Sequence, residues 1–331
     1  MDRRFRFTYT NDSEWCLNKD KNNILIMMRQ FIKPDKVDLT LMKKLRMKYE
    51  RIAFFHDDAG GGIPRLEVLP LVDLFYSKAL FRDKNLYTRQ LYGKELYSNY
   101  YHEKYGVTDS EVHERAIVQN SVDLGKLRLS WNIGIGDYPR GKFRQRSGVA
   151  FARLFGTTVC KPFYLNTPFP ENPVEQNREL YPVHARIGLI NRPSISYQRK
   201  LILEKIQDDE RFLTGAVSQK QFNYETAHSR IVLSPFGWGE LCLRDFETIR
   251  GGALLLKPDM SHLETWPDVF LPYKTYVPFS WDVDDLIEKA AYYLENREEC
   301  RKIAQNAVCE YRNQSGELQK RFSNIMEEIC L

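Results

Sequence analysis

The stretch that decides the fold runs from Arg230 to Asp259: RIVLSPFGWGELCLRDFETIRGGALLLKPD. It begins with the apolar, β-branched run Arg230–Ser234, which is typical of a buried strand in a parallel sheet. Gly237 and Gly239 follow, and they permit a tight turn whose backbone N–H groups can face a ligand. The stretch therefore opens with a strand that leads into a glycine turn.

A helix and a second strand complete the stretch. The spacing of the apolar residues predicts a helix over Glu240–Arg250, which Gly251 and Gly252 end. Ala253–Leu256 then predicts a second buried strand, with Lys257 at its tip. A strand, a helix and a strand with short connections are typical of a parallel α/β unit.

Three charged residues share one face of the predicted helix. Glu240, Arg244 and Glu247 are spaced i, i+4 and i+7, so they fall within an arc of roughly 60°. One interpretation is an internal ion pair, in which the two glutamates flank the arginine. The other is a nucleotide-sugar site, because a carboxylate can accept both ribose hydroxyls and an arginine can neutralise a diphosphate. The spacing alone leaves both interpretations open.

The stretch resembles part of the C-terminal domain of GT-B glycosyltransferases. It is most similar to exostosin-type and related bacterial or viral polysaccharide transferases, whose helix carries an Arg and a Glu before a glycine and a hydrophobic strand. Arg244, Glu247 and Gly251–Leu256 occupy those places here. The commoner group of these enzymes has glutamates eight positions apart, whereas Glu240 and Glu247 are seven apart. The resemblance covers about residues 187–306.

The resemblance implies an α/β enzyme with two Rossmann-like domains that face each other across a cleft. The second domain would hold a nucleotide-sugar donor, which is a substrate, so no cofactor is expected. The first would present a glycan or glycolipid acceptor, as in polysaccharide biosynthesis. GT-B enzymes generally need no metal, and we expect none. The expected donor contacts are Arg192, Arg199, Gly237, Gly239, Glu240, Arg244, Glu247 and Lys257.

Arg192 and Arg199 also stand out from the sequence itself. They flank the start of a helix predicted from about Ser196 to Gln207, which follows an apolar strand expected at Ala185–Ile190. Positive charge at the carboxyl end of a parallel strand, beside a helix N-terminus, suits a phosphate group. The alternative is that both arginines lie on the surface and pair with aspartates further along the chain.

The catalytic side of the cleft is expected in the first half, where strands and helices also alternate. The predicted strand Arg51–Phe55 ends in His56, Asp57 and Asp58, and three glycines follow. Titratable groups at the carboxyl end of a parallel strand suit a general base that takes the proton of an acceptor hydroxyl. Alternatively, one of the aspartates caps the glycine turn.

We expect the domain boundary near Asn166–Glu179, a polar segment with three prolines. The predicted domains are residues 1–170 on the acceptor side and residues 171–315 on the donor side. Residues 316–331 are expected to form a helix that packs back on the first domain.

Length and composition agree with a two-domain enzyme. The chain has 331 residues, of which 43% are hydrophobic, enough for two ordinary cores. No apolar run reaches the roughly 18 residues of a spanning helix, and the N-terminus lacks the apolar core of a signal peptide. The six cysteines show no paired spacing, which predicts free thiols in a reducing, cytoplasmic setting.

The net charge of +5 favours anionic ligands without requiring nucleic acid. The densest basic run, Arg140–Arg146, holds one aromatic residue, so no nucleic-acid partner is expected. A peripheral association with a membrane surface stays open. The main alternative to an enzyme is a catalytically inactive module of the same fold that binds a glycan or a nucleotide.

Overall fold

The structure is a computed structural model of the whole chain. It describes residues 4–32, 37–56, 58–63, 65–112, 114–135, 147–148, 150–151, 154–155, 169–176, 179–189 and 192–331.

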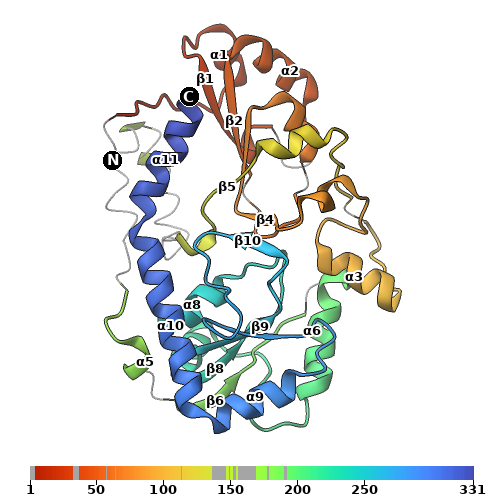
Figure 1. Cartoon of the computed structure of the whole chain (residues 1–331), viewed down its shortest axis with the longest axis vertical. Coiled ribbons are helices and arrows are strands. Elements are labelled where there is room, and N and C mark those ends of the chain that lie inside the picture. The colour runs from red at the N-terminus through yellow and green to blue at the C-terminus, as the bar shows by residue number, and fades with distance from the viewer. Residues whose placement is uncertain are drawn as a thin grey trace.

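The first half of the chain builds a parallel four-stranded sheet in the order β1-β2-β3-β5 (Figure 1). Its strands are β1 (Ile24–Met28), β2 (Arg51–His56), β3 (Leu74–Ser77) and β5 (Leu127–Leu129). The helix α2 (Leu39–Lys48) connects β1 to β2 and buries Met42 and Leu45. Asp38 caps α2, since its Oδ1 accepts a hydrogen bond of 2.9 Å from the backbone N–H of Leu41.

The second half builds a parallel five-stranded sheet in the order β11-β9-β8-β6-β7. Its strands are β6 (Tyr181–His184), β7 (Phe212–Leu213), β8 (Ser229–Leu233), β9 (Leu254–Pro258) and β11 (Val277–Phe279). The central strands β8 and β9 are almost entirely buried, as strands covered on both faces must be. The predicted fold class, α/β with two Rossmann-like parallel sheets, is confirmed.

Helices surround the second sheet and reach back to the first. They are α5 (Pro173–Gln176), α6 (Pro193–Ile206), α7 (Gln219–His228), α8 (Leu243–Gly251), α9 (Leu286–Glu295), α10 (Arg297–Gly316) and α11 (Leu318–Cys330). In Figure 1, α10 and α11 run along one side of the molecule past both sheets. The buried side chains Ile325, Met326 and Ile329 of α11 pack against residues of β2 and β3.

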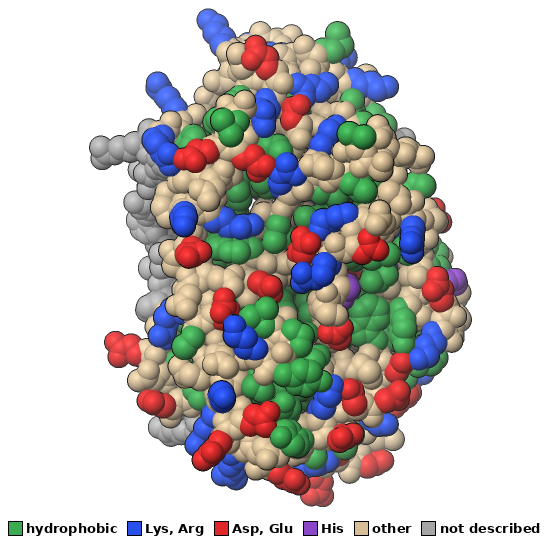
Figure 2. Space-filling model, in the orientation of Figure 1, with side chains coloured by type: hydrophobic (Ala, Val, Ile, Leu, Met, Phe, Trp, Pro, Cys, Tyr) green, Lys and Arg blue, Asp and Glu red, His purple; other side chains and the backbone are tan. Residues whose placement is uncertain are grey.

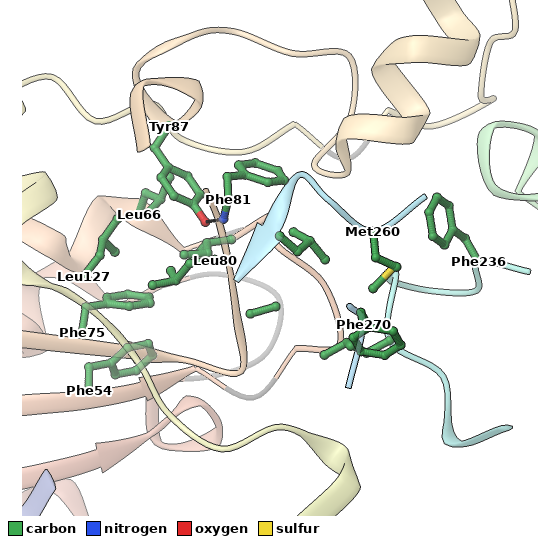
Figure 3. Close-up of a cluster of buried hydrophobic side chains, with 14 of the residues drawn as sticks. Phe54, Leu66, Phe75, Leu80, Phe81, Tyr87, Leu127, Phe236, Met260 and Phe270 are labelled. Atoms are coloured by element: carbon green, nitrogen blue, oxygen red, sulfur yellow. Dashed lines mark hydrogen bonds between the residues drawn. The ribbon is translucent and has the colours of Figure 1, made fainter. Parts of the chain in front are cut away.

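The two halves also share a small sheet and an aromatic core. β4 (Ala79–Phe81) from the first half pairs antiparallel with β10 (Leu263–Thr265) from the second. Figure 3 shows side chains of both halves in one apolar cluster, from Phe54 and Phe75 to Phe236 and Phe270. Among the described residues of the first half, shorter elements include α1 (Ser13–Asn18), α3 (Leu96–Tyr105) and the 3₁₀ turns Arg29–Ile32, Leu66–Leu71, Lys84–Thr88, Ser121–Lys126 and Ile133–Ile135.

Two expected boundaries are wrong. The strand expected at Ala185–Ile190 lies at Tyr181–His184 instead. The apolar run that suggested the strand follows it, and Pro182, which has no N–H, made the true strand look unlike one in the sequence. The helix expected from Glu240 begins at Leu243, because Cys242 is its N-cap and donates its N–H to Oδ2 of Asp245. Glu240 therefore precedes the helix.

The predicted domain bounds stay a prediction, although the two parallel sheets fall at residues 24–129 and 181–279. Across the described part of the chain, no helix combines the length and apolar character needed to cross a membrane.

Candidate functional site

The loops at the carboxyl ends of β2 and β8 touch each other. The N–H of Leu241 donates to the carbonyl of Ala59 at 2.9 Å, and the N–H of Gly61 donates to Oε2 of Glu240 at 3.2 Å. A Cβ on Gly239 would lie 2.6 Å from the carbonyl oxygen of Ala59, so glycine is what permits this approach. Ligands of open α/β sheets bind at these strand ends, so both expected halves of the site meet here.

Glu240 joins the two halves from a fully buried position. Its Oε1 lies 3.3 Å from Nε2 of His262, and its Oε2 accepts the hydrogen bond from Gly61. Since it precedes α8, Glu240 does not share a helical face with Arg244 and Glu247. Both oxygens of this carboxylate therefore contact protein groups in this arrangement.

Arg199 ties together the loops that follow β6 and β8. Its Nε donates to the carbonyl of Phe236 at 2.8 Å and its Nη1 to the carbonyl of Gly188 at 2.6 Å. Gly237 and Gly239 close the turn beside it, with a hydrogen bond of 3.0 Å from the N–H of Gly237 to the carbonyl of Gly239. Burial lowers the pKa of Arg199, which still lies far above neutrality for a guanidinium.

Arg244 reaches from α8 to the same strand ends. Its Nη1 donates to the carbonyl of Leu233 at 3.2 Å and its Nη2 to the carbonyl of Arg186 at 2.7 Å. Its guanidinium carbon lies 5.1 Å from the ring centre of Phe222. Glu247, one turn further along, is exposed and forms no ion pair with Arg244, so the internal ion pair considered above is absent.

The two guanidinium groups are held by backbone carbonyls and not by close ion pairs. Neither Arg199 nor Arg244 forms an ion pair with a residue that the structure describes; both are held by backbone carbonyls. Burial lowers the pKa of Arg244, and repulsion from the positive charge of Arg199 lowers it further. The two guanidinium groups therefore interact electrostatically. Partly buried cations without a counter-charge favour a bound anion.

Large apolar side chains are exposed on these loops and at the start of α8, and no sequence expectation included them. Leu189 is 61% exposed, Trp238 is 59% exposed and Leu243 is 50% exposed. The signal in the sequence was a tryptophan between Gly237 and Gly239, since a turn exposes the residue at its tip. An aromatic face beside two arginines can pack on a flat ligand.

Lys257 lies inside the second half. Its ammonium is fully buried, 3.1 Å from Oδ2 of Asp245, and the hydroxyl of Ser234 donates to Oδ1 of the same aspartate at 2.5 Å. Lys257 therefore faces Asp245 in this arrangement, beneath the start of α8.

Arg192 bridges the two halves at the start of α6. Its Nε donates to Oδ2 of Asp109 at 2.8 Å, and its Nη2 lies 3.4 Å from Oε2 of Glu95. The N–H and the hydroxyl of Ser194 also donate to Asp109, which thereby caps α6. The sequence analysis missed Asp109 and Glu95, because nothing in their local sequence marks partners more than 80 positions away.

His56 and Asp58 lie together at the end of β2, and Lys94 approaches them. The side chain of His56 is fully buried, with Nε2 3.7 Å from Oδ2 of Asp58, and Nζ of Lys94 lies 2.9 Å from the same oxygen. Burial lowers the pKa of His56, which keeps its imidazole neutral near pH 7. Both ring nitrogens lack a hydrogen-bond partner among the described residues.

Other sequence candidates fall elsewhere. Asp57 lies outside the described residues, as does the basic run Arg140–Arg146. Within the described part of the chain, no group of three or more His, Cys, Asp and Glu side chains is arranged to hold a metal. Asp282 precedes α9, which begins at Leu286, and accepts hydrogen bonds from the hydroxyls of Tyr100 and Tyr105.

The second half of the chain is similar to a known protein family. Residues 198–327 match a family described as "Glycosyl transferase-like". The matched segment runs from within α6 to within α11, includes Arg199, Arg244 and Glu247, and contains no part of the first half of the chain. The prediction of a glycosyltransferase enzyme is confirmed at this level, while the exostosin-like or viral character stays a prediction. No curated protein matches the sequence.

Several solved structures are similar to this chain. The trehalose-phosphate synthase (UDP-forming) of Burkholderia vietnamiensis is 10% identical over 93% of this chain and 74% of that chain, with a TM-score of 0.45. The pneumococcal O-GlcNAc transferase GtfA is 11% identical over 96% of this chain and 59% of that chain, with a TM-score of 0.46. A glycosyltransferase of Rickettsia africae is 10% identical over 94% of this chain and 99% of that chain, with a TM-score of 0.35. At such identities the likeness concerns the fold alone.

Proposed function

We propose that this protein transfers a sugar from a nucleotide-sugar donor to a glycan or glycolipid acceptor. The observation that carries the proposal is a pair of partly buried guanidinium groups, Arg199 and Arg244, at the carboxyl ends of β6 and β8, which backbone carbonyls hold and which form no ion pair with a described residue. The family match over residues 198–327 supports it, because both arginines lie within the matched segment.

The diphosphate of the donor would lie between these two arginines. Each guanidinium is held in place by carbonyl groups, so little conformational freedom is lost when an anion binds. Both are partly withdrawn from water, which strengthens their attraction for phosphate oxygens. The turn at Gly237–Gly239 lies against Arg199, since a Cβ on Gly237 would be 3.4 Å from Nη2 of that arginine.

The nucleoside would extend over the exposed side of α8. Glu247 projects one helical turn from Arg244 and can accept hydrogen bonds from both ribose hydroxyls. The exposed side chains of Leu189 and Trp238 offer an apolar surface for the base.

Transfer requires a base for the acceptor hydroxyl, and we assign that role to His56, whose buried imidazole has to become accessible when the acceptor binds. The acceptor oxygen attacks the anomeric carbon, its proton passes to the neutral imidazole, and the bond from that carbon to the phosphate oxygen breaks. Asp58 orients the imidazole and stabilises it when it is protonated. Arg199 and Arg244 offset the charge on the departing nucleoside diphosphate, so the proposal includes no metal ion and no cofactor.

The acceptor would approach from the first half. Figure 2 shows basic, acidic and hydrophobic side chains mixed along the middle of one face of the molecule. The proposal includes a cytoplasmic location and a role in polysaccharide biosynthesis. An inactive binding module of the same fold would bind the donor without releasing nucleoside diphosphate.

Nucleotide binding tests the proposal. UDP, GDP, ADP and CMP should be compared for their effect on Tm, since a ligand of the native state raises it by mass action. We expect one of them to bind, and Glu247→Gln to weaken its binding by about tenfold, or roughly 1.4 kcal/mol. Glu298→Gln, an exposed carboxylate on α10, is the matched control. A flat response to all four nucleotides would contradict the donor site.

A further inference from the structure

A crevice of about 370 Å³ lies on the far side of the first sheet from His56. It opens between α11, the ends of β3 and β5, and the segment after β10. Ten residues line it: Tyr76, Arg128, Leu129, Trp266, Glu317, Lys320, Arg321, Asn324, Ile325 and Glu328. A volume of this size suits a small ligand, and neither the family match nor the proposed transfer uses these residues.

Glu328 and Arg128 neutralise each other at one wall of the crevice. Nε of Arg128 donates to Oε1 of Glu328 at 2.6 Å, and the hydroxyl of Tyr76 donates to Oε2 at 2.6 Å. Burial alone would raise the pKa of Glu328, but these two hydrogen bonds outweigh it and lower the pKa. Both oxygens of Glu328 are therefore occupied by protein groups, and the pair adds no net charge to the crevice.

Arg321 is held rigidly at the opposite wall. Its guanidinium carbon lies 4.6 Å from the ring centre of Trp266, and its Nη2 donates to the carbonyl of Leu129 at 2.6 Å. Its Nη1 makes no hydrogen bond with any residue that the structure describes. A guanidinium that is stacked on an indole and fixed by a carbonyl presents its free edge in one orientation, which is how arginine recognises planar oxyanions.

The remaining polar groups leave the crevice positive. Lys320 and Arg321 contribute two positive charges and Glu317 contributes one negative charge, once Arg128 and Glu328 are set against each other. Asn324 adds an amide that can donate or accept. Apolar ligands are disfavoured because most of the lining groups would lose water without gaining a partner.

We propose that this crevice is a second ligand site, which binds the carboxylate or phosphate group of a small molecule through Arg321, Lys320 and Asn324. Trp266 and Leu129 supply the apolar part of its wall. The site is separate from the arginine pair at the second sheet, so it does not depend on the proposed transfer.

Binding of glucuronate and of inorganic phosphate tests this site, with glucose as the neutral control. Calorimetry on the full chain should detect saturable binding of one or both anions, and the preference between them identifies carboxylate or phosphate as the group recognised. Lys320→Gln should weaken binding at this crevice about fivefold, and the double variant with Arg321→Gln should abolish it, leaving only the phosphate that binds at Arg199 and Arg244. Lys302→Gln on α10 removes an exposed lysine outside the crevice and should change nothing.

The result that would overturn the proposal is equal anion binding in wild type and in Lys320→Gln, or no saturable binding of either anion. Lys320 is exposed, so its single variant is expected to fold even if the double variant does not. Nucleotide binding, measured on the same variants, should be unaffected, which separates a failure of this site from a failure of the donor site.

Discussion

Asp58 keeps its negative charge at physiological pH because its neighbours favour the ionised form. Burial alone would raise its pKa, but the contacts with His56 and with the ammonium of Lys94, at 2.9 Å, outweigh burial and lower the pKa well below its ordinary value. An ionised Asp58 can accept a hydrogen bond from the imidazole and hold it in place. His56, which burial keeps neutral, is then the group that can take a proton.

Replacing Asp58 by Asn should cost about 2 kcal/mol of unfolding free energy at pH 7, because Lys94 would keep its charge in a largely buried place without that partner. The pKa of Asp58 is lower in the folded than in the unfolded protein. Its stabilisation is therefore present above about pH 4 and is lost as the pH falls through the folded-state pKa. Urea unfolding at pH 7 and pH 3 measures the effect, and an equal loss at both would refute the assignment.

The pH dependence of transfer reports on His56. Because burial lowers its pKa, the imidazole is neutral over a wider range than usual, and the rate should fall only when the pH drops below about 6.5. His56→Gln should remove this acid limb and slow transfer by roughly 10²-fold or more. If the limb persisted in the variant, another group would be the base.

Two loops, one after β2 and one after β8, meet through their glycine backbone and the buried side chain of Glu240. Gly239 faces the carbonyl of Ala59, and Leu241 donates a hydrogen bond to that residue. The close approach brings the end of β2, with His56, toward the end of β8 and the arginine pair. The glycines after both strands are therefore part of the geometry of the site.

Gly239→Ala should destabilise the protein by about 2 kcal/mol, since its Cβ would lie 2.6 Å from a backbone oxygen that cannot move alone. It should also lower the transfer rate by moving the two loops apart. Gly125→Ala is the matched control, because no atom lies within 4 Å of the added Cβ. Thermal unfolding of both variants gives the comparison, and equal Tm values would mean that the loops can separate freely.

The helix α11 stabilises the first sheet from the C-terminal end of the chain. Ile329 is fully buried against this sheet, whereas Leu331, two positions later, is 93% exposed. Ile329→Ala should therefore cost about 3 kcal/mol, and Leu331→Ala almost nothing. Urea unfolding distinguishes the two, and a small effect at Ile329 would show that α11 is only loosely attached.

Prediction from sequence worked where burial on both faces leaves a continuous apolar run. β8 and β9 are of this kind, so their places followed from pattern alone. Prediction failed where a contact with a residue distant in the sequence determines the position of a side chain. Lys257 is buried because Asp245 neutralises it, and Glu240 leaves the helical face because that same aspartate caps α8 from Cys242 onward. Contacts of this kind leave no local pattern.

For the whole molecule, the arrangement joins two parallel sheets through contacts that cross between them. β4 pairs with β10, Arg192 reaches Asp109, and the α10–α11 segment runs past both sheets (Figure 1). The candidate base comes from the first half and the anion-binding arginines from the second. Transfer of a sugar needs both at once, so the function belongs to the assembled chain.

The most direct test of the central claim is the release of nucleoside diphosphate from a panel of UDP-, GDP- and ADP-sugars, in the presence of glycan acceptors. We expect turnover with one donor class, and a loss of at least about 10²-fold when Arg199 and Arg244 are each replaced by Gln, with the fold checked by circular dichroism. Turnover that is unchanged without the two guanidinium groups, or no release from any donor that binds, would contradict it.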